Sequence, residues 1–236
     1  MSNRTQTLES LRMRVRELES ECHSLGDKAS TGCDELDGLL GGQGFEHGSL
    51  VEWIGSAGSG ATTLALKAAQ AACKQHMLVV LDRNGQFYPT AAAAVGIDLQ
   101  RTIVIRPNST QDYQWSLLQI LRSTGIAAVV CWPDKANEKM LRRWQLAAEH
   151  GKTLGFLVRP PTALREPTWA KVRLLVEAQH SLTNTRQWRV TILGSVRNDS
   201  IELELNDESG RLQKACPLPV ATSLVDPTPL QRSTGA

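Results

Sequence analysis

A glycine-rich stretch, Gly55-Ser-Ala-Gly-Ser-Gly-Ala-Thr-Thr63, constrains the fold of this chain more than any other feature. It directly follows an apolar run at 49–54 and opens a stretch at 62–75 with helical spacing of apolar residues. A glycine loop between a strand and a helix turns successive backbone N–H groups inward, and the helix adds its positive end, so the loop can hold an anion. We expect a phosphate-binding loop here, formed by Gly55, Gly58, Gly60, Thr62 and Thr63. The alternative is that the glycines only make a tight turn between strand and helix.

The loop lacks one residue that ATP-hydrolysing loops of this kind need. Their pattern is GxxxxGK(S/T), in which the lysine reaches the β- and γ-phosphates and the hydroxyl meets magnesium. This chain has Ala61 in place of the lysine and keeps Thr62. We therefore expect ATP or ADP to bind weakly, no cofactor to be required, and catalysis to be lost.

Short apolar runs alternate with helical stretches over most of the chain, which is typical of an α/β fold with a mostly parallel sheet. Further strands are predicted at 77–82, 102–106, 126–132 and 153–158, and further helices at 89–95, 110–122 and 136–150. From Trp169 the pattern changes to strands without long helices, including 188–196 and 201–205 with a turn at 206–210. We expect these to be antiparallel strands that extend the sheet.

The two ends of the chain differ from this core in composition. Residues 1–28 form a predicted amphipathic helix and linker, residues 29–216 the core, and residues 217–236 a flexible tail with four prolines. The helix either folds back on its own domain or binds a partner. Its candidate partner-binding residues are Leu8, Leu11, Val15 and Leu18.

Composition excludes several functional classes. The formal net charge of +2 does not indicate a large surface for binding nucleic acid. The five cysteines form no pair or cluster with the spacing of a metal site, and they indicate no disulfide framework. No apolar run is long enough to span a membrane and no signal peptide is evident, so we expect a cytoplasmic protein.

The sequence resembles the RecA family beyond the glycine loop. Ser30-Thr-Gly32, the leucines and glycines up to Gly41, and the stretch Gly42 to Glu52 are similar to the segments that lead into the loop in that family. The resemblance continues through Val79 to Pro89 and covers about residues 30–206. It implies a RecA-like core with a phosphate-binding loop.

The same resemblance shows where this chain departs from a working ATPase. The position of the glutamate that activates water holds Asn84, and that of the adenine-stacking tyrosine holds Ala91. Trp132 takes the position of the aspartate that assists magnesium, although Asp134 keeps a shift of register open. The polar sensor falls at Arg159. Together with Ala61, these changes imply abandoned catalysis.

The two DNA-binding loops of the RecA family are short in this chain, at 133–139 and 160–167. DNA contact is therefore expected to be weak. The candidate residues for this contact are Arg142, Arg143, Arg159, Arg165 and Lys171. The alternative is that these charges only face solvent, as charged residues at helical spacing commonly do.

Within this family the chain resembles the ImuA-type accessory proteins of damage-induced mutagenesis, which have a similar opening to Leu8-Glu-Ser-Leu-Arg-Met-Arg-Val-Arg-Glu-Leu-Glu19. The resemblance implies an adaptor in translesion DNA synthesis whose partners are RecA, an ImuB-like polymerase homologue and an error-prone polymerase. One alternative is an atypical KaiC-like ATPase that uses Asp82 or Asp134 for magnesium. Another is a division inhibitor of the SulA type.

Overall fold

The computed structural model describes residues 28–73, 76–133, 135–180, 185–194, 199–205 and 212–215. These residues form a nine-stranded sheet in the order β11-β10-β9-β8-β3-β7-β6-β4-β5. Six of its strands are parallel: β3 (Leu50–Ile54), β4 (Leu78–Leu81), β5 (Thr102–Ile105), β6 (Ala128–Cys131), β7 (Leu154–Arg159) and β8 (Val172–Gln179). The α/β class with a mostly parallel sheet is confirmed.

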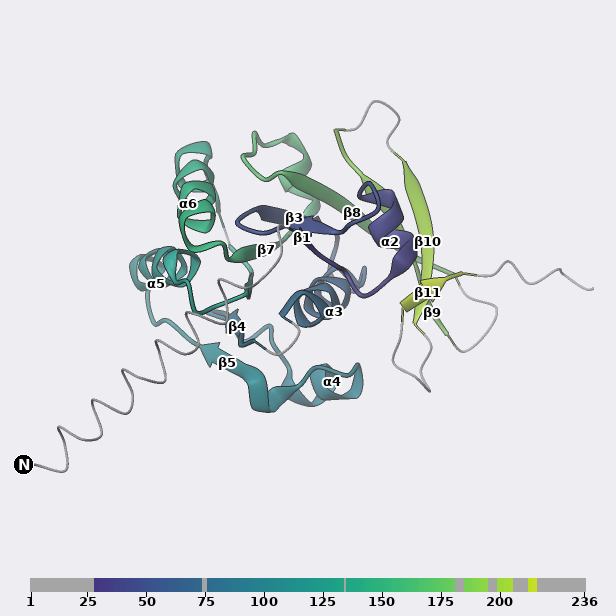
Figure 1. The fold of residues 1–236 in the computed structure, drawn as a ribbon, viewed down its shortest axis with the longest axis horizontal. Helices are drawn as coiled ribbons and strands as arrows, with labels where there is room; N and C mark the ends of the chain where they lie inside the picture. The colour runs from purple at the N-terminus through teal and green to yellow at the C-terminus, as the bar shows by residue number, and fades with distance from the viewer. Residues whose placement is uncertain are drawn as a thin grey trace, which may run out of the picture.

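Helices cover both faces of the parallel part (Figure 1). One face carries α3 (Ala61–Cys73), and the other carries α5 (Thr110–Arg122) and α6 (Glu138–Gly151). The shorter helical segments are α4 (Pro89–Ala94), η1 (Leu99–Arg101) and η2 (Pro161–Arg165). The predicted helices at 62–75, 89–95, 110–122 and 136–150 correspond to α3, α4, α5 and α6, with small differences at their ends.

The core has two halves because side chains alternate across each strand. On β3, Val51 and Trp53 pack toward α3, whereas Leu50 packs toward α5 and α6. The buried positions of α3 are largely alanine, including Ala65, Ala68, Ala69 and Ala72, so this helix lies close to the sheet. Close packing fixes the position of the glycine loop at the start of α3.

The C-terminal strands extend the sheet in the predicted antiparallel manner. β9 (Arg186–Ile192) pairs with β8, β10 (Ser200–Leu205) with β9, and β11 (Leu212–Lys214) with β10. We did not predict β8 or β11, nor the small sheet of β1 (Lys28–Ala29) with β2 (Phe45–Glu46) and the short α2 (Asp34–Leu39). The predicted N-terminal helix, the turn at 206–210 and the tail at 217–236 lie outside the described residues, apart from the first strand residue Lys28.

One buried glutamine joins α6 to the start of β3. The side-chain oxygen of Gln145 accepts a hydrogen bond from Leu50 N at 3.0 Å, and its amide nitrogen donates to Gly48 O at 3.1 Å. Gln145 is buried, so it replaces water as the partner of two backbone groups that helix and sheet leave unpaired.

Candidate nucleotide pocket

The glycine loop connects the end of β3 to the first turn of α3. Gly58 and Gly60 have φ angles of 80° and 92°, in the left-handed region that favours glycine. Gly55 N donates to Arg159 O at 3.0 Å, and Ser59 N donates to Ser56 O at 3.0 Å. The first bond holds the start of the loop against β7 and the second closes a turn within the loop, while Leu64 N donates to Gly60 O at 3.0 Å and joins its end to the first turn of α3.

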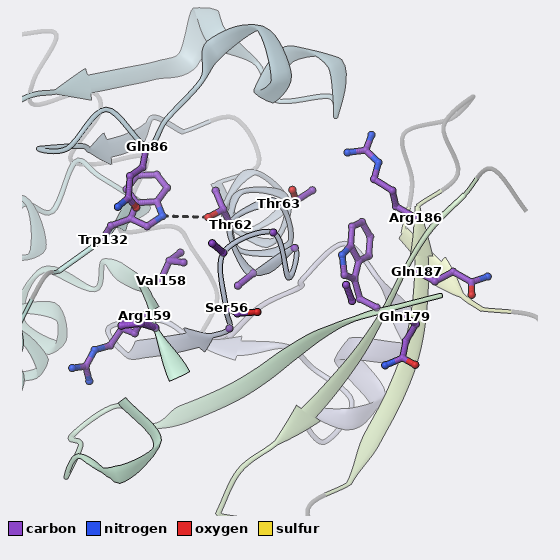
Figure 2. Close-up of a pocket in the computed structure, with 18 of the residues that line it drawn as sticks. Ser56, Thr62, Thr63, Gln86, Trp132, Val158, Arg159, Gln179, Arg186 and Gln187 are labelled. Atoms are coloured by element: carbon purple, nitrogen blue, oxygen red, sulfur yellow. Dashed lines mark hydrogen bonds between the residues drawn. The ribbon is translucent and has the colours of Figure 1, made fainter. Parts of the chain in front are cut away.

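The loop forms one wall of a cavity of about 900 Å³. All five predicted binding residues, Gly55, Gly58, Gly60, Thr62 and Thr63, line it. The cavity lies at the carboxyl ends of parallel strands, where ligands of open α/β sheets bind. Figure 2 shows the loop between Trp132 and Gln86 on one side and Gln179, Arg186 and Gln187 on the other.

Trp132 interacts directly with the residue that would serve magnesium. Its indole Nε1 donates a hydrogen bond to Thr62 Oγ1 at 3.2 Å, drawn as a dashed line in Figure 2. The indole is largely buried, and an indole N–H can donate but cannot bind a cation. A magnesium ion bound to this hydroxyl would have to share the space beside it with the indole ring, so the residues present do not fit a magnesium site.

A second tryptophan packs on the loop from the antiparallel part of the sheet. A Cβ atom added to Gly60 would lie 1.9 Å from Trp188 Nε1, and one added to Gly55 would lie 2.1 Å from Ser59 Oγ. Glycine is therefore required at both positions by close packing, in addition to the positive φ of Gly60. Close packing thus accounts for glycine at these two positions, and the loop residues also line the cavity.

The loop that follows β4 is held by Asp82. This buried carboxylate accepts hydrogen bonds from Gln86 N at 2.8 Å and Phe87 N at 3.1 Å. Asp82 therefore has a structural role, which argues against the alternative in which it binds magnesium. The other residue of that alternative, Asp134, lies outside the described residues.

The same loop places a residue in the pocket that sequence reasoning missed. Gln86 lines the cavity, whereas Asn84, the residue at the expected water-activating position, is exposed and does not line it. An amide at either position cannot accept a proton from water. Ala91, at the expected base-stacking position, is exposed on α4 and also lies outside the cavity lining.

Cys131 immediately precedes Trp132 but is not available as a nucleophile. The side chain is fully buried at the end of β6, and this burial raises the pKa of its thiol to about 12. The thiol therefore stays protonated at neutral pH, and the thiolate is the reactive form.

The prediction that Arg159 contacts DNA is wrong. Its side chain is only 3% exposed and points away from the glycine loop (Figure 2). Arg159 pairs with Glu52 at 2.8 Å and with Glu166 at 2.5 Å, and Arg173 binds the second oxygen of Glu52 at 2.7 Å. This buried ion-pair cluster joins β3, β7, β8 and η2, so the guanidinium is not free to meet a phosphate.

The other candidate DNA contacts are exposed but are distributed over separate elements. Arg142 and Arg143 lie on α6, where Arg142 stands 5.0 Å from the centre of the Trp169 ring. Arg165 lies on η2, and Lys171 pairs with Glu46 at 2.8 Å. DNA contact through these residues stays a prediction. Leu8, Leu11, Val15 and Leu18 lie outside the described residues.

The glycine loop at a strand end, the order of the parallel strands and the position of the cavity define a RecA-like type of α/β core. Residues 12–136, just over half of the chain, match the model of the RecA N-terminal domain, and the chain belongs to this family.

Known relatives agree with this assignment. Protein RecA of Rhodopirellula baltica is 30% identical over 105 residues, which are 44% of this chain and 28% of the relative. Protein RecA of Chlorobaculum parvum is 36% identical over 102 residues, 43% of this chain and 29% of the relative. The match thus spans less than a third of the length of these relatives. None of the described helices combines the length and apolarity that a membrane-spanning helix needs.

Proposed function

We propose that this chain is a RecA-family protein without ATP turnover that acts as an accessory factor in damage-induced translesion DNA synthesis. Its role is to bind RecA, a polymerase homologue of the ImuB type, an error-prone polymerase, or a combination of these. The observation that carries the loss of turnover is the hydrogen bond from Trp132 Nε1 to Thr62 Oγ1 beside Ala61.

Phosphoryl transfer to water needs positive charge at the γ-phosphate, a metal ion and an oriented water. Ala61 supplies no charge, and Trp132 places an N–H donor where a metal-assisting carboxylate is expected. Gln86, the residue of the β4 loop that lines the cavity, is an amide and cannot act as a base. This supports a protein whose RecA-like shape is used for binding.

The partner role is supported by the resemblance of the N-terminal segment to ImuA-type proteins. The stripe of Leu8, Leu11, Val15 and Leu18 would bury apolar surface when it meets a partner. A RecA-shaped body without turnover can also occupy a contact surface made for a RecA protomer. Localisation in the cytoplasm belongs to the same proposal.

The test of turnover is phosphate release by the purified full chain with magnesium and ATP. We expect no release above that of a Thr62→Ala variant. Release well above background that Thr62→Ala abolishes would instead establish the atypical ATPase.

The test of partner binding uses purified RecA and the polymerase homologue immobilised separately. We expect Leu11→Asp or Val15→Asp to weaken capture of the chain by about 10-fold or more, since a charge in an apolar contact costs more than 1.4 kcal/mol. Ser20→Asp is the matched control, because on the predicted helix it falls opposite the apolar stripe. Equal binding by all three variants would reject the role of the stripe.

Nucleotide binding without turnover is a second proposal for the same pocket, supported by the open cavity of about 900 Å³ beside the loop. If nucleotide binds the folded state, ADP or ATP should raise the melting temperature by about 2 to 4 °C per kcal/mol of linked binding. An unchanged melting temperature at millimolar nucleotide, with and without magnesium, would leave the loop with only its structural role.

A further inference from the structure

The outer surface of α5 and α6 carries large apolar side chains that the fold does not use. The two helices lie next to each other on one side of the sheet (Figure 1). Their inner residues, including Leu117 and Leu141, are fully buried. On the outer side, Trp115 is 64% exposed and Leu146 is 57% exposed. Exposed side chains of this size on adjacent helices indicate a binding surface more strongly than a single exposed residue does.

The spacing on both helices gathers these residues into stripes. Trp115, Leu118 and Arg122 follow one another at intervals of three and four along α5. Arg143, Leu146 and His150 have the same intervals along α6. Residues at such intervals share one face of a helix. Between the stripes lies a groove of about 380 Å³ lined by Leu118, Arg122, Arg143, Leu146, Ala147 and His150.

The basic residues of the groove have no acidic partners in the part of the chain that the structure describes. Arg122 and Arg143 are both exposed, and no described carboxylate pairs with either. The nearby Glu149 accepts a hydrogen bond from Gln145 at 2.9 Å. Two other exposed basic side chains are paired: Lys171 with Glu46 and Arg189 with Glu202, each at 2.8 Å. The groove is therefore apolar between its helices and positive along its rim.

We propose that the groove between α5 and α6 is a docking site for an acidic segment of a protein partner that carries leucine or phenylalanine anchors. An aliphatic or aromatic side chain would fill the space between Leu118 and Leu146, and carboxylates on either side would meet Arg122 and Arg143. Apolar anchors in a pocket supply most of the binding energy, and the surrounding charges give specificity.

Other occupants match this surface less well. Nucleic acid would neutralise the arginines but leave Trp115 and Leu146 without an apolar counterpart. The predicted N-terminal helix, residues 8–25, has four acidic against three basic side chains, and the tail, residues 217–236, has one of each. The helix as a whole thus has a net charge of −1 and the tail has none, whereas the rim favours a segment with a larger acidic excess.

The docking site is tested with a fluorescein-labelled peptide of alternating Glu-Glu and Leu-Leu pairs, measured by fluorescence anisotropy with the full chain. We expect saturable binding that is absent for the same peptide with lysine in place of glutamate. Arg143→Glu and Leu146→Ser should each weaken binding by about 10-fold or more. Arg165→Glu and Leu164→Ser are matched controls, because both residues are exposed on η2, and they should bind as the unchanged protein does. Circular dichroism confirms that each variant is folded.

A photocrosslinking residue at position 115 identifies the natural occupant in cells after DNA damage. An adduct with an acidic, leucine- or phenylalanine-bearing segment of another protein, lost in Arg143→Glu, supports the proposal. An adduct with residues 8–25 or with a second copy of this chain overturns it. The proposal is also overturned if the peptide does not bind and a single-stranded oligonucleotide does, with binding that depends on Arg143 but not on Leu146. The groove shares no lining residue with the nucleotide cavity, so failure here leaves the proposed loss of ATP turnover untouched.

Discussion

At the scale of single residues, Trp132 has a structural role. Its hydrogen bond to Thr62 links the end of β6 to the first turn of α3, which the glycine loop opens. Trp132→Phe and Thr62→Val should each destabilise the protein, because each variant removes this hydrogen bond. In a double-mutant cycle their interaction should amount to about 0.5–1.5 kcal/mol, the usual net worth of a neutral hydrogen bond. Urea unfolding of the four proteins measures it, and strictly additive effects would show that the two side chains do not interact.

Arg159 gives a second prediction at this scale. Arg159→Met removes one of the two arginines that neutralise Glu52, a carboxylate that is fully buried. Breaking a buried ion pair from one side costs about 3–5 kcal/mol, because the remaining charge stays out of water. Lys171→Met, which breaks the exposed pair with Glu46, is the control and should cost about 0–1 kcal/mol. Similar losses of unfolding free energy in both variants would contradict a structural role for the buried cluster.

At the scale of elements, the position of α6 depends on Gln145. Gln145→Leu leaves Leu50 N and Gly48 O without their side-chain partner at a site closed to water. We expect a loss of about 1–3 kcal/mol for each buried group left unpaired. Gln119→Leu, an exposed change on α5, should have little effect. Chemical denaturation compares them, and equal stability of the two variants would mean that another group or water pairs with these backbone atoms.

The parallel elements could be predicted from the sequence because each carries its own signal. Buried strands such as 128–131 are continuous apolar runs, and α5 begins after Ser109, whose side chain accepts a hydrogen bond from Asp112 N as an N-cap. We did not predict β8 because it lacks the regular alternation of buried and exposed residues that marks a strand. Glu177 and Ala178, for example, are consecutive and both exposed. β11 has only three residues, too few for a pattern.

The candidate site shows the same division between local and long-range information. The glycine loop was predictable because it is contiguous in sequence. The packing of Trp188 on Gly60 joins positions more than 120 residues apart, and no local pattern indicates it. The ion pairs of Arg159 likewise depend on β3, η2 and β8 meeting at one place, so its charge alone gave the wrong prediction of an exposed DNA contact.

At the scale of the whole molecule, catalysis depends on several segments that meet only in the folded chain. Ala61→Lys supplies the ammonium that the loop lacks, but leaves Trp132 on Thr62 and Gln86 at the cavity. We expect no measurable phosphate release from this variant, although nucleotide affinity should rise because charge is added next to the phosphates. Phosphate release and the nucleotide-dependent melting temperature measure the two effects separately. Turnover by Ala61→Lys alone would show that the rest of the site is still competent.

Under the proposed loss of turnover, the contact between Trp132 and Thr62 also opposes a return to catalysis. Replacing the indole with an aspartate would leave an unfilled space, and position 61 would still lack the lysine that reaches the phosphates. Removing a large aromatic side chain from a packed site costs about 3–5 kcal/mol, a large part of the stability of an ordinary domain. The replacement of Trp132 by aspartate therefore lowers stability before it restores any activity. Under the proposed function, Trp132 thus favours retention of a binding role over a return to ATP hydrolysis.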